Sequence, residues 1–272
     1  MDNELLRADV ALVRRGLAPS RERAQALIAG GLAYHNGHLL TKPAQKIAPE
    51  DDVRVLGSDR PYVSRGGLKL EKALKVFGVA AEGVVALDVG ASTGGFTDVL
   101  LQNGAAKVYA VDVGHDQLDA SLRKHPRVVS MEGINARRLP VERFDPLPTL
   151  AVMDVSFISI RLILPGLFSL LGENGRVLAL IKPQFEAGRA NIGKGGVVTK
   201  HGVHEAVLQS MADFVPTLGW KISALDFSPV AGGDGNLEFL ADMLPAERAG
   251  AGPTPEEIRN LVKAARAALA GK

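Results

Sequence analysis

Residues 86–100 read ALDVGASTGGFTDVL: an apolar run that ends in an acid, a glycine-rich turn, and the start of a helical pattern. The spacing from Gly90 matches the phosphate-binding loop G-x-x-x-x-G-K-T, except that Phe96 replaces the lysine. Without that cation, hydrolysis of a nucleoside triphosphate is not expected. The dinucleotide fingerprint G-x-G-x-x-G fails as well, because residue 92 is a serine.

The acids around this loop indicate a different ligand. Asp112 ends the next predicted strand, where a carboxylate can accept hydrogen bonds from a ribose diol. Asp88 places an anion beside the loop, which disfavours a pyrophosphate and favours a ligand with positive charge, such as S-adenosylmethionine. A plain strand-turn-helix corner is the alternative, and the pair of acids favours the nucleoside ligand over it.

The apolar pattern around the loop predicts the fold. Apolar runs recur at 84–89, 108–113, 128–131, 150–155, 177–181 and 222–227, with helix-like stretches between most of them. This alternation predicts an α/β fold with a mostly parallel sheet covered on both faces. A late strand at 237–244 would be antiparallel because its connection is short, and a capping box from Thr254 to Glu257 predicts a final helix.

Residues 7–56 form a separate, smaller α+β pattern. It contains two short helices, the second capped by Ser20, and strands joined at Asn36-Gly37, a typical hairpin turn. Although the net charge of the chain is only +2, seven Lys/Arg oppose two acids between residues 7 and 46. This excess favours contact with phosphates, and a solvated helix face is the alternative.

Composition excludes several classes of protein. The chain has no cysteine, so disulfides, thiolate metal sites and a cysteine nucleophile are excluded. The start lacks a signal-peptide pattern, and the longest apolar stretches are shorter than the ~20 residues that span a bilayer. We therefore expect a cytoplasmic protein with no membrane, metal or obligate protein partner.

Four polar residues stand at positions typical of a site. Asp154 and Lys182 end predicted strands, where open α/β sheets bind ligands, while Lys69 opens a helix and Glu238 begins the last strand. A second lysine beside Lys182, together with partial burial, favours a neutral amine that can act as a general base on a hydroxyl. Spacing alone slightly favours the alternative of two separate surface salt bridges.

Motifs along nearly the whole chain resemble one family. They read RADVALVRRGLAPSRERAQ, RPYVSRGGLKL, LDVGASTGGFTD, DVSFISI, KPQFEAG, GKGGVV and GNLEFL. They are similar to the TlyA (hemolysin A) family of ribosomal RNA 2′-O-methyltransferases, whose catalytic part is FtsJ-like. The resemblance implies a Rossmann-like class I methyltransferase domain (64–272), preceded by a ribosomal-protein-S-four-type RNA-binding domain (1–59) and a linker (60–63).

The resemblance also implies an activity and site residues. The expected reaction is transfer of a methyl group from S-adenosylmethionine to the 2′-hydroxyl of a cytidine in ribosomal RNA within a ribosomal subunit. The family's K-D-K-E catalytic tetrad falls on Lys69, Asp154, Lys182 and Glu238. The expected cofactor residues are Asp88, Gly90, Ala91, Ser92, Thr93, Gly94, Gly95, Asp112, Asn135 and Asp154. The expected RNA-binding residues are Arg7, Arg14, Arg21, Arg23, Lys42, Arg65, Phe157 and Arg189.

Two further segments have open alternatives. Phe157, next to the predicted reaction centre, is either a core residue or a platform for a base turned out of its helix. The glycine-rich stretch 188–196 is either a lid that touches RNA or an ordinary loop. Two other functions also stay open: a membrane-active hemolysin, although no long, strongly apolar helix face is predicted, and a non-catalytic RNA-binding module, against which the intact tetrad argues.

Overall fold

The computed structural model describes residues 5–18, 20–29, 32–55, 62–232 and 235–269. The chain divides into two compact units, Met1–Pro61 and Tyr62–Lys272. Tyr62 and Val63, assigned to the linker from sequence, pack in the second unit: the Tyr62 hydroxyl donates to Glu71 (2.9 Å) and the Val63 amide donates to Asp98 (2.8 Å). Residues 60 and 61 of the expected linker lie outside the described part of the chain.

The first unit packs two helices against short strands. Its elements are β1 (Leu6–Arg7), α1 (Ala8–Arg14), α2 (Arg21–Ala29), β2 (Ala33–His35), β3 (His38–Leu39), β4 (Lys46–Ile47) and β5 (Val53–Val55). Strand β1 pairs with β4, and β2 lies between β3 and β5, all antiparallel. The predicted start of α2 is confirmed, because the Ser20 hydroxyl accepts a hydrogen bond from the Arg23 amide (3.2 Å). Asn36 and Gly37 both have positive φ, as a two-residue hairpin requires.

The second unit is built on a seven-stranded sheet in the order β11-β12-β10-β9-β6-β7-β8. Its strands are β6 (Val85–Val89), β7 (Lys107–Val111), β8 (Val128–Met131), β9 (Leu150–Met153), β10 (Arg176–Ile181), β11 (Trp220–Phe227) and β12 (Phe239–Pro245). Strands β6 to β10 are parallel, whereas β12 runs antiparallel to both β10 and β11, which confirms the predicted late antiparallel strand. The predicted strand ends differ from the observed ones by two residues or fewer.

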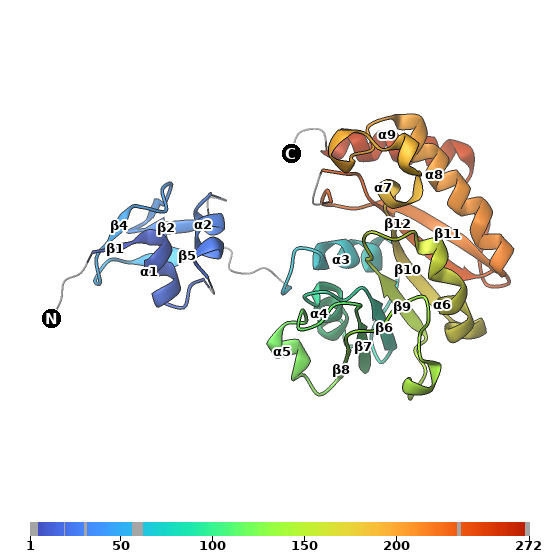
Figure 1. The fold of residues 1–272 in the computed structure, drawn as a ribbon, viewed down its shortest axis with the longest axis horizontal. Helices are drawn as coiled ribbons and strands as arrows, with labels where there is room; N and C mark the ends of the chain where they lie inside the picture. The colour runs from blue at the N-terminus through green and yellow to red at the C-terminus, as the bar shows by residue number, and fades with distance from the viewer. Residues whose placement is uncertain (1–4, 19, 30–31, 56–61, 233–234, 270–272) are drawn as a thin grey trace. The chain divides into compact units, whose positions relative to one another are not determined.

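Helices cover both faces of this sheet (Figure 1). They are α3 (Gly67–Val76), α4 (Gly95–Gln102), α5 (Ala120–Arg123), α6 (Leu164–Leu171), α7 (Pro183–Glu186), α8 (His201–Phe214) and α9 (Pro255–Leu269). Short 3-10 turns include η4 (Arg189–Asn191) and η5 (Lys194–Gly196). None of the described helices combines the length and apolar character needed to cross a membrane. The fold is therefore the predicted α/β fold with a mostly parallel sheet covered on both faces, in which β12 is the antiparallel strand.

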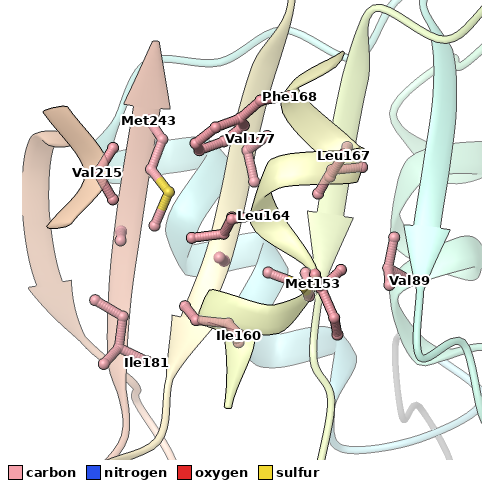
Figure 2. Packing of buried hydrophobic residues seen from close by; sticks show 14 of the residues in the cluster. Val89, Met153, Ile160, Leu164, Leu167, Phe168, Val177, Ile181, Val215 and Met243 are labelled. Atoms are coloured by element: carbon pink, nitrogen blue, oxygen red, sulfur yellow. The ribbon is translucent and has the colours of Figure 1, made fainter. Parts of the chain in front are cut away.

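Alternation along the strands sorts side chains into two cores. Val89, Met153 and Ile181 point to the face covered by α6, α8 and α9 and belong to the same core cluster as Leu164 and Leu167 (Figure 2). The residues between them, such as Ala86, Val152 and Leu180, point to the face covered by α3 and α4. Because both faces are buried, each strand reads as a continuous apolar run. Polar side chains are therefore expected mainly at the ends of the strands.

Candidate active site

The four predicted catalytic residues come from four elements that meet at the carboxyl ends of the central parallel strands. Asp154 directly follows β9 and Lys182 directly follows β10, and these strands are parallel neighbours. Glu238 directly precedes β12, whose antiparallel register pairs Phe239 with Ile181. This register brings Glu238 beside Lys182, and the first turn of α3 adds Lys69.

Their side chains form one ion network. Nζ of Lys69 lies 2.6 Å from Glu238 and 3.1 Å from Asp154, and Nζ of Lys182 lies 2.5 Å from Asp154 and 3.9 Å from Glu238. Lys69, Lys182 and Glu238 are buried, and Asp154 is half-buried. The alternative of two separate surface ion pairs does not describe this arrangement. Two buried cations and two carboxylates balance each other, as burial of charge requires.

The network fixes the charges of two of its members. Burial disfavours the ammonium of Lys69, but the adjacent Asp154 and Glu238 outweigh this effect and raise the pKa of Lys69 above its usual value. Burial likewise opposes ionisation of Asp154, but Lys69 and Lys182 outweigh it and lower the pKa of Asp154 below its usual value. Lys69 is therefore a permanent cation and Asp154 a permanent anion at neutral pH.

Two cavities meet at this network. One, the lysine cavity, has a volume of about 680 Å³, and its walls include Ser64, Lys69, Asp154, Lys182, Phe185 and Glu238. The other, the Asp112 cavity, has a volume of about 490 Å³, and its walls include Asp112, Gln117, Asn135, Arg137 and Ile163. Gly90, Ser92, Asp154, Ser156 and Phe157 line both. One cavity is therefore next to the lysines, the other extends to the predicted ribose-binding acid, and they share a boundary at Asp154.

The glycine loop forms part of that boundary. Gly90 has φ +83°, and a Cβ atom there would lie 2.8 Å from the carbonyl oxygen of Asp154, so no side chain fits. The Asp112 carboxylate accepts hydrogen bonds from the amides of Ser92 (2.8 Å) and Gly114 (2.7 Å). Of the predicted cofactor residues, Gly90, Ala91, Ser92, Thr93, Gly95, Asp112, Asn135 and Asp154 line one or both cavities.

Asp88 and Gly94 differ, because neither is among the described residues that line the two cavities. Strand alternation turns Asp88 toward α4, where the Thr97 hydroxyl donates to its Oδ2 (2.7 Å) and Oδ1 is buried without a hydrogen-bond partner. Burial raises the pKa of Asp88 to about 7, although hydrogen bonds from Thr97 oppose that change. Gly94 has φ +96° and packs against Leu122, a role in the turn itself.

Phe157 is exposed at the mouth of both cavities. Its side chain is 93% exposed, its φ is +64°, and its ring centroid lies 5.4 Å from that of Phe185. The core role that the sequence left open is therefore wrong. A strained backbone that holds an aromatic ring in solvent is typical of a functional position.

The predicted RNA-binding cations have different surroundings. Arg7 and Arg21 pair with the buried Asp9 at 3.0 and 3.1 Å, and hydrogen bonds from Arg7 and other side chains hold the pKa of Asp9 below its usual range. Arg14 and Lys42 are exposed, and Arg23 is half-buried in α2. In the second unit, Arg65 and Arg189 are also exposed. Arg7 and Arg21 thus have a structural role that the sequence analysis did not assign.

The lysine cavity also contains residues that the sequence did not indicate, among them Ser156, Gln184 and Phe185. The Ser156 hydroxyl accepts a hydrogen bond from Nζ of Lys182 (2.9 Å), and Gln184 and Phe185 line the wall that follows Lys182. All three lie inside motifs that the sequence analysis quoted, DVSFISI and KPQFEAG. Proximity in sequence to Asp154 and Lys182 was the available signal, but only folding identifies which side chains face the cavity.

Comparison with known proteins gives a consistent set of relatives. The FtsJ-like methyltransferase family matches residues 62–242 and the S4 domain matches residues 6–53. A Bacillus subtilis protein, described provisionally as the rRNA methyltransferase YqxC, is 48% identical over 100% of this chain and 98% of its own. The Mycobacterium tuberculosis 16S/23S rRNA (cytidine-2′-O)-methyltransferase TlyA is 43% identical over 86% of this chain and 88% of its own.

One solved structure matches both units. It is a Streptococcus thermophilus protein, described provisionally as a hemolysin, with a TM-score of 0.78 and 45% identity. The match covers 99% of this chain and 98% of that one.

Proposed function

Because the chain belongs to the FtsJ-like methyltransferase family and to the TlyA (hemolysin A) group within it, we propose that it methylates ribosomal RNA. The proposed acceptor is the 2′-hydroxyl of a cytidine ribose, and the proposed donor is S-adenosylmethionine. The observation that carries the proposal is the buried network of Lys69, Asp154, Lys182 and Glu238 at the boundary of two cavities. A ribosomal substrate implies that the enzyme acts in the cytoplasm.

The Asp112 cavity suits the methyl donor. Asp112 and Asn135 offer polar groups for a ribose and a base, and Gly90 leaves room for a ligand to approach the backbone. Asp154, an anion at the boundary with the lysine cavity, favours a cationic sulfonium there. When bound, S-adenosylmethionine would supply an electrophilic methyl group.

The lysine cavity suits the acceptor ribose. Lys182 is proposed as the general base: in its neutral form, its Nζ would accept the proton that the ribose 2′-hydroxyl loses on methylation. Lys69 contacts both carboxylates within 3.1 Å, so it weakens their hold on the proton of Lys182. Ser156 and Asp154 orient the amine. Positioning of the two substrates contributes much of the acceleration.

Methyl transfer to isolated ribosomal subunits tests this proposal. The protein is incubated with radiolabelled S-adenosylmethionine and unmethylated small subunits, large subunits or protein-free rRNA, and the labelled nucleotide is mapped. We expect label on the 2′-oxygen of a cytidine. Label on a base would contradict the proposed acceptor, and cofactor binding without transfer to any of the RNAs would indicate a non-catalytic RNA-binding protein.

A further inference from the structure

Asn236 is a buried amide in the segment that leads to Glu238. Its side chain is almost fully buried, with 1% of the residue exposed. Both ends of the amide bond to a loop about forty residues earlier in the chain. The Val198 amide donates to Oδ1 and Nδ2 donates to the carbonyl oxygen of Gly196, each at 3.0 Å.

The loop held in this way forms a wall of the lysine cavity. Ile192 and Gly196 line that cavity, and the Gly193 amide donates to the Val197 carbonyl (2.9 Å), which closes residues 193–197 into a turn. Apart from Ile192, whose side chain is half-buried, the described side chains of 188–196 are exposed. Val198, at the end of this loop, is buried with 3% of the residue exposed, so the Asn236 amide and the burial of Val198 together fix a loop whose other side chains are mostly exposed.

The segment that carries Asn236 also fixes a catalytic carboxylate. The Gly232 amide donates to the Asn236 carbonyl (3.0 Å), and the Ser228 amide donates to the Glu238 carbonyl (2.8 Å). A Cβ atom at Gly232 would lie 2.7 Å from Oε1 of Glu238. These backbone contacts hold Glu238 without the Asn236 side chain, whose own hydrogen bonds go to the loop.

We propose that Asn236 is a positioning residue for the RNA acceptor: its amide holds the 192–198 loop as the wall against which the target nucleotide is seated. This inference rests on the proposed function. An amide suits the task because it is both donor and acceptor, whereas a carboxylate only accepts and an aliphatic side chain does neither. Loss of the amide leaves the buried Val198 N–H and the part-buried Gly196 carbonyl without these partners, which favours release of the loop.

Two substitutions test this role. Asn236→Leu removes both hydrogen bonds at similar volume, and Asn236→Asp keeps an acceptor for Val198 but loses the donor to Gly196. Asn191→Ala is the matched control, since it removes an exposed amide in the same loop that donates to Ala187 (2.8 Å). For each protein we would measure the KM for RNA, kcat, cofactor affinity by calorimetry, and the rate of trypsin cleavage between residues 189 and 200.

The expected result for both Asn236 variants is a KM for RNA raised about tenfold and faster loop cleavage, consistent with loss of buried hydrogen bonds. The kcat at saturating RNA and the cofactor affinity should stay within about twofold of wild type, and Asn191→Ala should match wild type. Unchanged KM and unchanged cleavage would overturn the inference, as would a parallel loss of kcat, KM and cofactor affinity. If wild type methylates no RNA, the proposed function fails, and the cleavage rates alone still decide whether Asn236 holds the loop.

Discussion

The two lysines of the active site differ in how many carboxylates they contact. Lys69 lies within 3.1 Å of both Asp154 and Glu238, whereas Lys182 lies 2.5 Å from Asp154 but 3.9 Å from Glu238. Lys182 also donates to Ser156, a neutral acceptor on the boundary of both cavities. Two residues of the same type thus have different surroundings, which favours Lys69 as the fixed charge and Lys182 as the group that exchanges a proton.

Replacement of Lys182 by methionine tests this assignment. General-base catalysis contributes roughly 10²–10⁴-fold, so we expect kcat for RNA methylation to fall by about that factor. Cofactor affinity should change little, because Lys182 does not line the Asp112 cavity in the described structure. Lys72→Met is the control, since Lys72 lies on the same helix as Lys69 but pairs with Asp226 (2.9 Å). A comparable loss of kcat in the control would argue against a specific role for Lys182.

Asp88 predicts a pH dependence of stability. Its pKa is about 7 in the folded protein against an ordinary value of 3.8, so between these pH values the folded state holds a proton that the unfolded chain has released. The free energy of unfolding should therefore fall as pH rises from about 4 to 7, by at most about 1.4 kcal/mol per pH unit from this group.

Asp88→Asn removes this contribution. Urea unfolding of the cofactor-free proteins at pH 5, 6 and 7 should show wild type losing stability relative to the variant. Asp213→Asn, at an exposed carboxylate of α8, should follow wild type. Parallel curves for wild type and Asp88→Asn would show that the buried carboxyl does not titrate in this range.

Phe157 is predicted to stack on the target base. Stacking of a base on an aromatic side chain contributes roughly 1–3 kcal/mol, so Phe157→Ala should lower kcat/KM for RNA about tenfold or more. Because the side chain is almost fully exposed, Tm should be unchanged, and the loss of RNA methylation should far exceed any loss of cofactor affinity. Leu162→Ala, at another exposed apolar residue, is the control. A joint loss of RNA methylation and cofactor binding would contradict the stacking role.

At the scale of elements, the first turn of α3 contains both a packing contact with Tyr62 and the active-site residue Lys69. Gly67 begins the helix, the ring of Tyr62 packs directly on it, and Lys69 follows in the same turn. A Cβ atom at Gly67 would lie 2.6 Å from that ring, whereas one at Gly66 would meet only the Ser64 hydroxyl at 3.3 Å. Two adjacent glycines therefore face different constraints, and only Gly67 keeps α3 close to the preceding chain.

Of the two variants Gly67→Ala and Gly66→Ala, only Gly67→Ala should consequently reduce stability and activity. Overpacking of this kind costs roughly 1–3 kcal/mol, and displacement of α3 would also move Lys69 from its carboxylates. We expect a lower Tm and a reduced kcat for Gly67→Ala, while Gly66→Ala, at a residue with helical φ and ψ, stays close to wild type. Thermal unfolding and methyl-transfer assays measure both effects, and equal behaviour of the two variants would refute the packing argument.

Across the whole molecule, the two cavities and the basic stretch 7–46 lie in different units. The second unit contains both cavities, and the first contains the stretch in which seven Lys/Arg oppose two acids, although nine Lys/Arg against eight acids leave that unit as a whole at +1. Asp9 binds two of those cations, so Arg14 and Lys42 are better candidates for phosphate contact. RNA affinity is therefore expected to depend on the first unit and on salt.

The double variant Arg14→Glu/Lys42→Glu tests that dependence. Loss of phosphate contacts should weaken RNA binding and make the dependence of log K on log salt less steep by about one per lost contact. Cofactor affinity should be unaffected. Arg54→Gln is the control, because Arg54 is already paired with Asp52 (2.8 Å) in the same unit. An unchanged salt dependence in the double variant would exclude these two side chains from the RNA interface.

The sequence by itself determined the elements and the residue types of the site. Apolar periodicity, the Ser20 cap and the Asn36-Gly37 turn are local signals, so they predicted most of the strands to within a few residues, although not the two-residue strands β1 and β4. The motifs around Lys69 and Lys182 likewise identified the candidate catalytic residues by resemblance. These features depend on neighbours within a few positions in the sequence. The sequence alone was therefore enough to predict them.

Only the tertiary structure decided which side chains meet and which way they face. The register of β12 against β10 brings Glu238 to Lys182, strand alternation turns Asp88 away from the cavities toward Thr97, and Phe157 stays in solvent. The contact of Asn236 with a loop about forty residues away has no local signal either. Such contacts depend on the packing of distant segments, and their energies come from burial and pairing that exist only after the chain has folded.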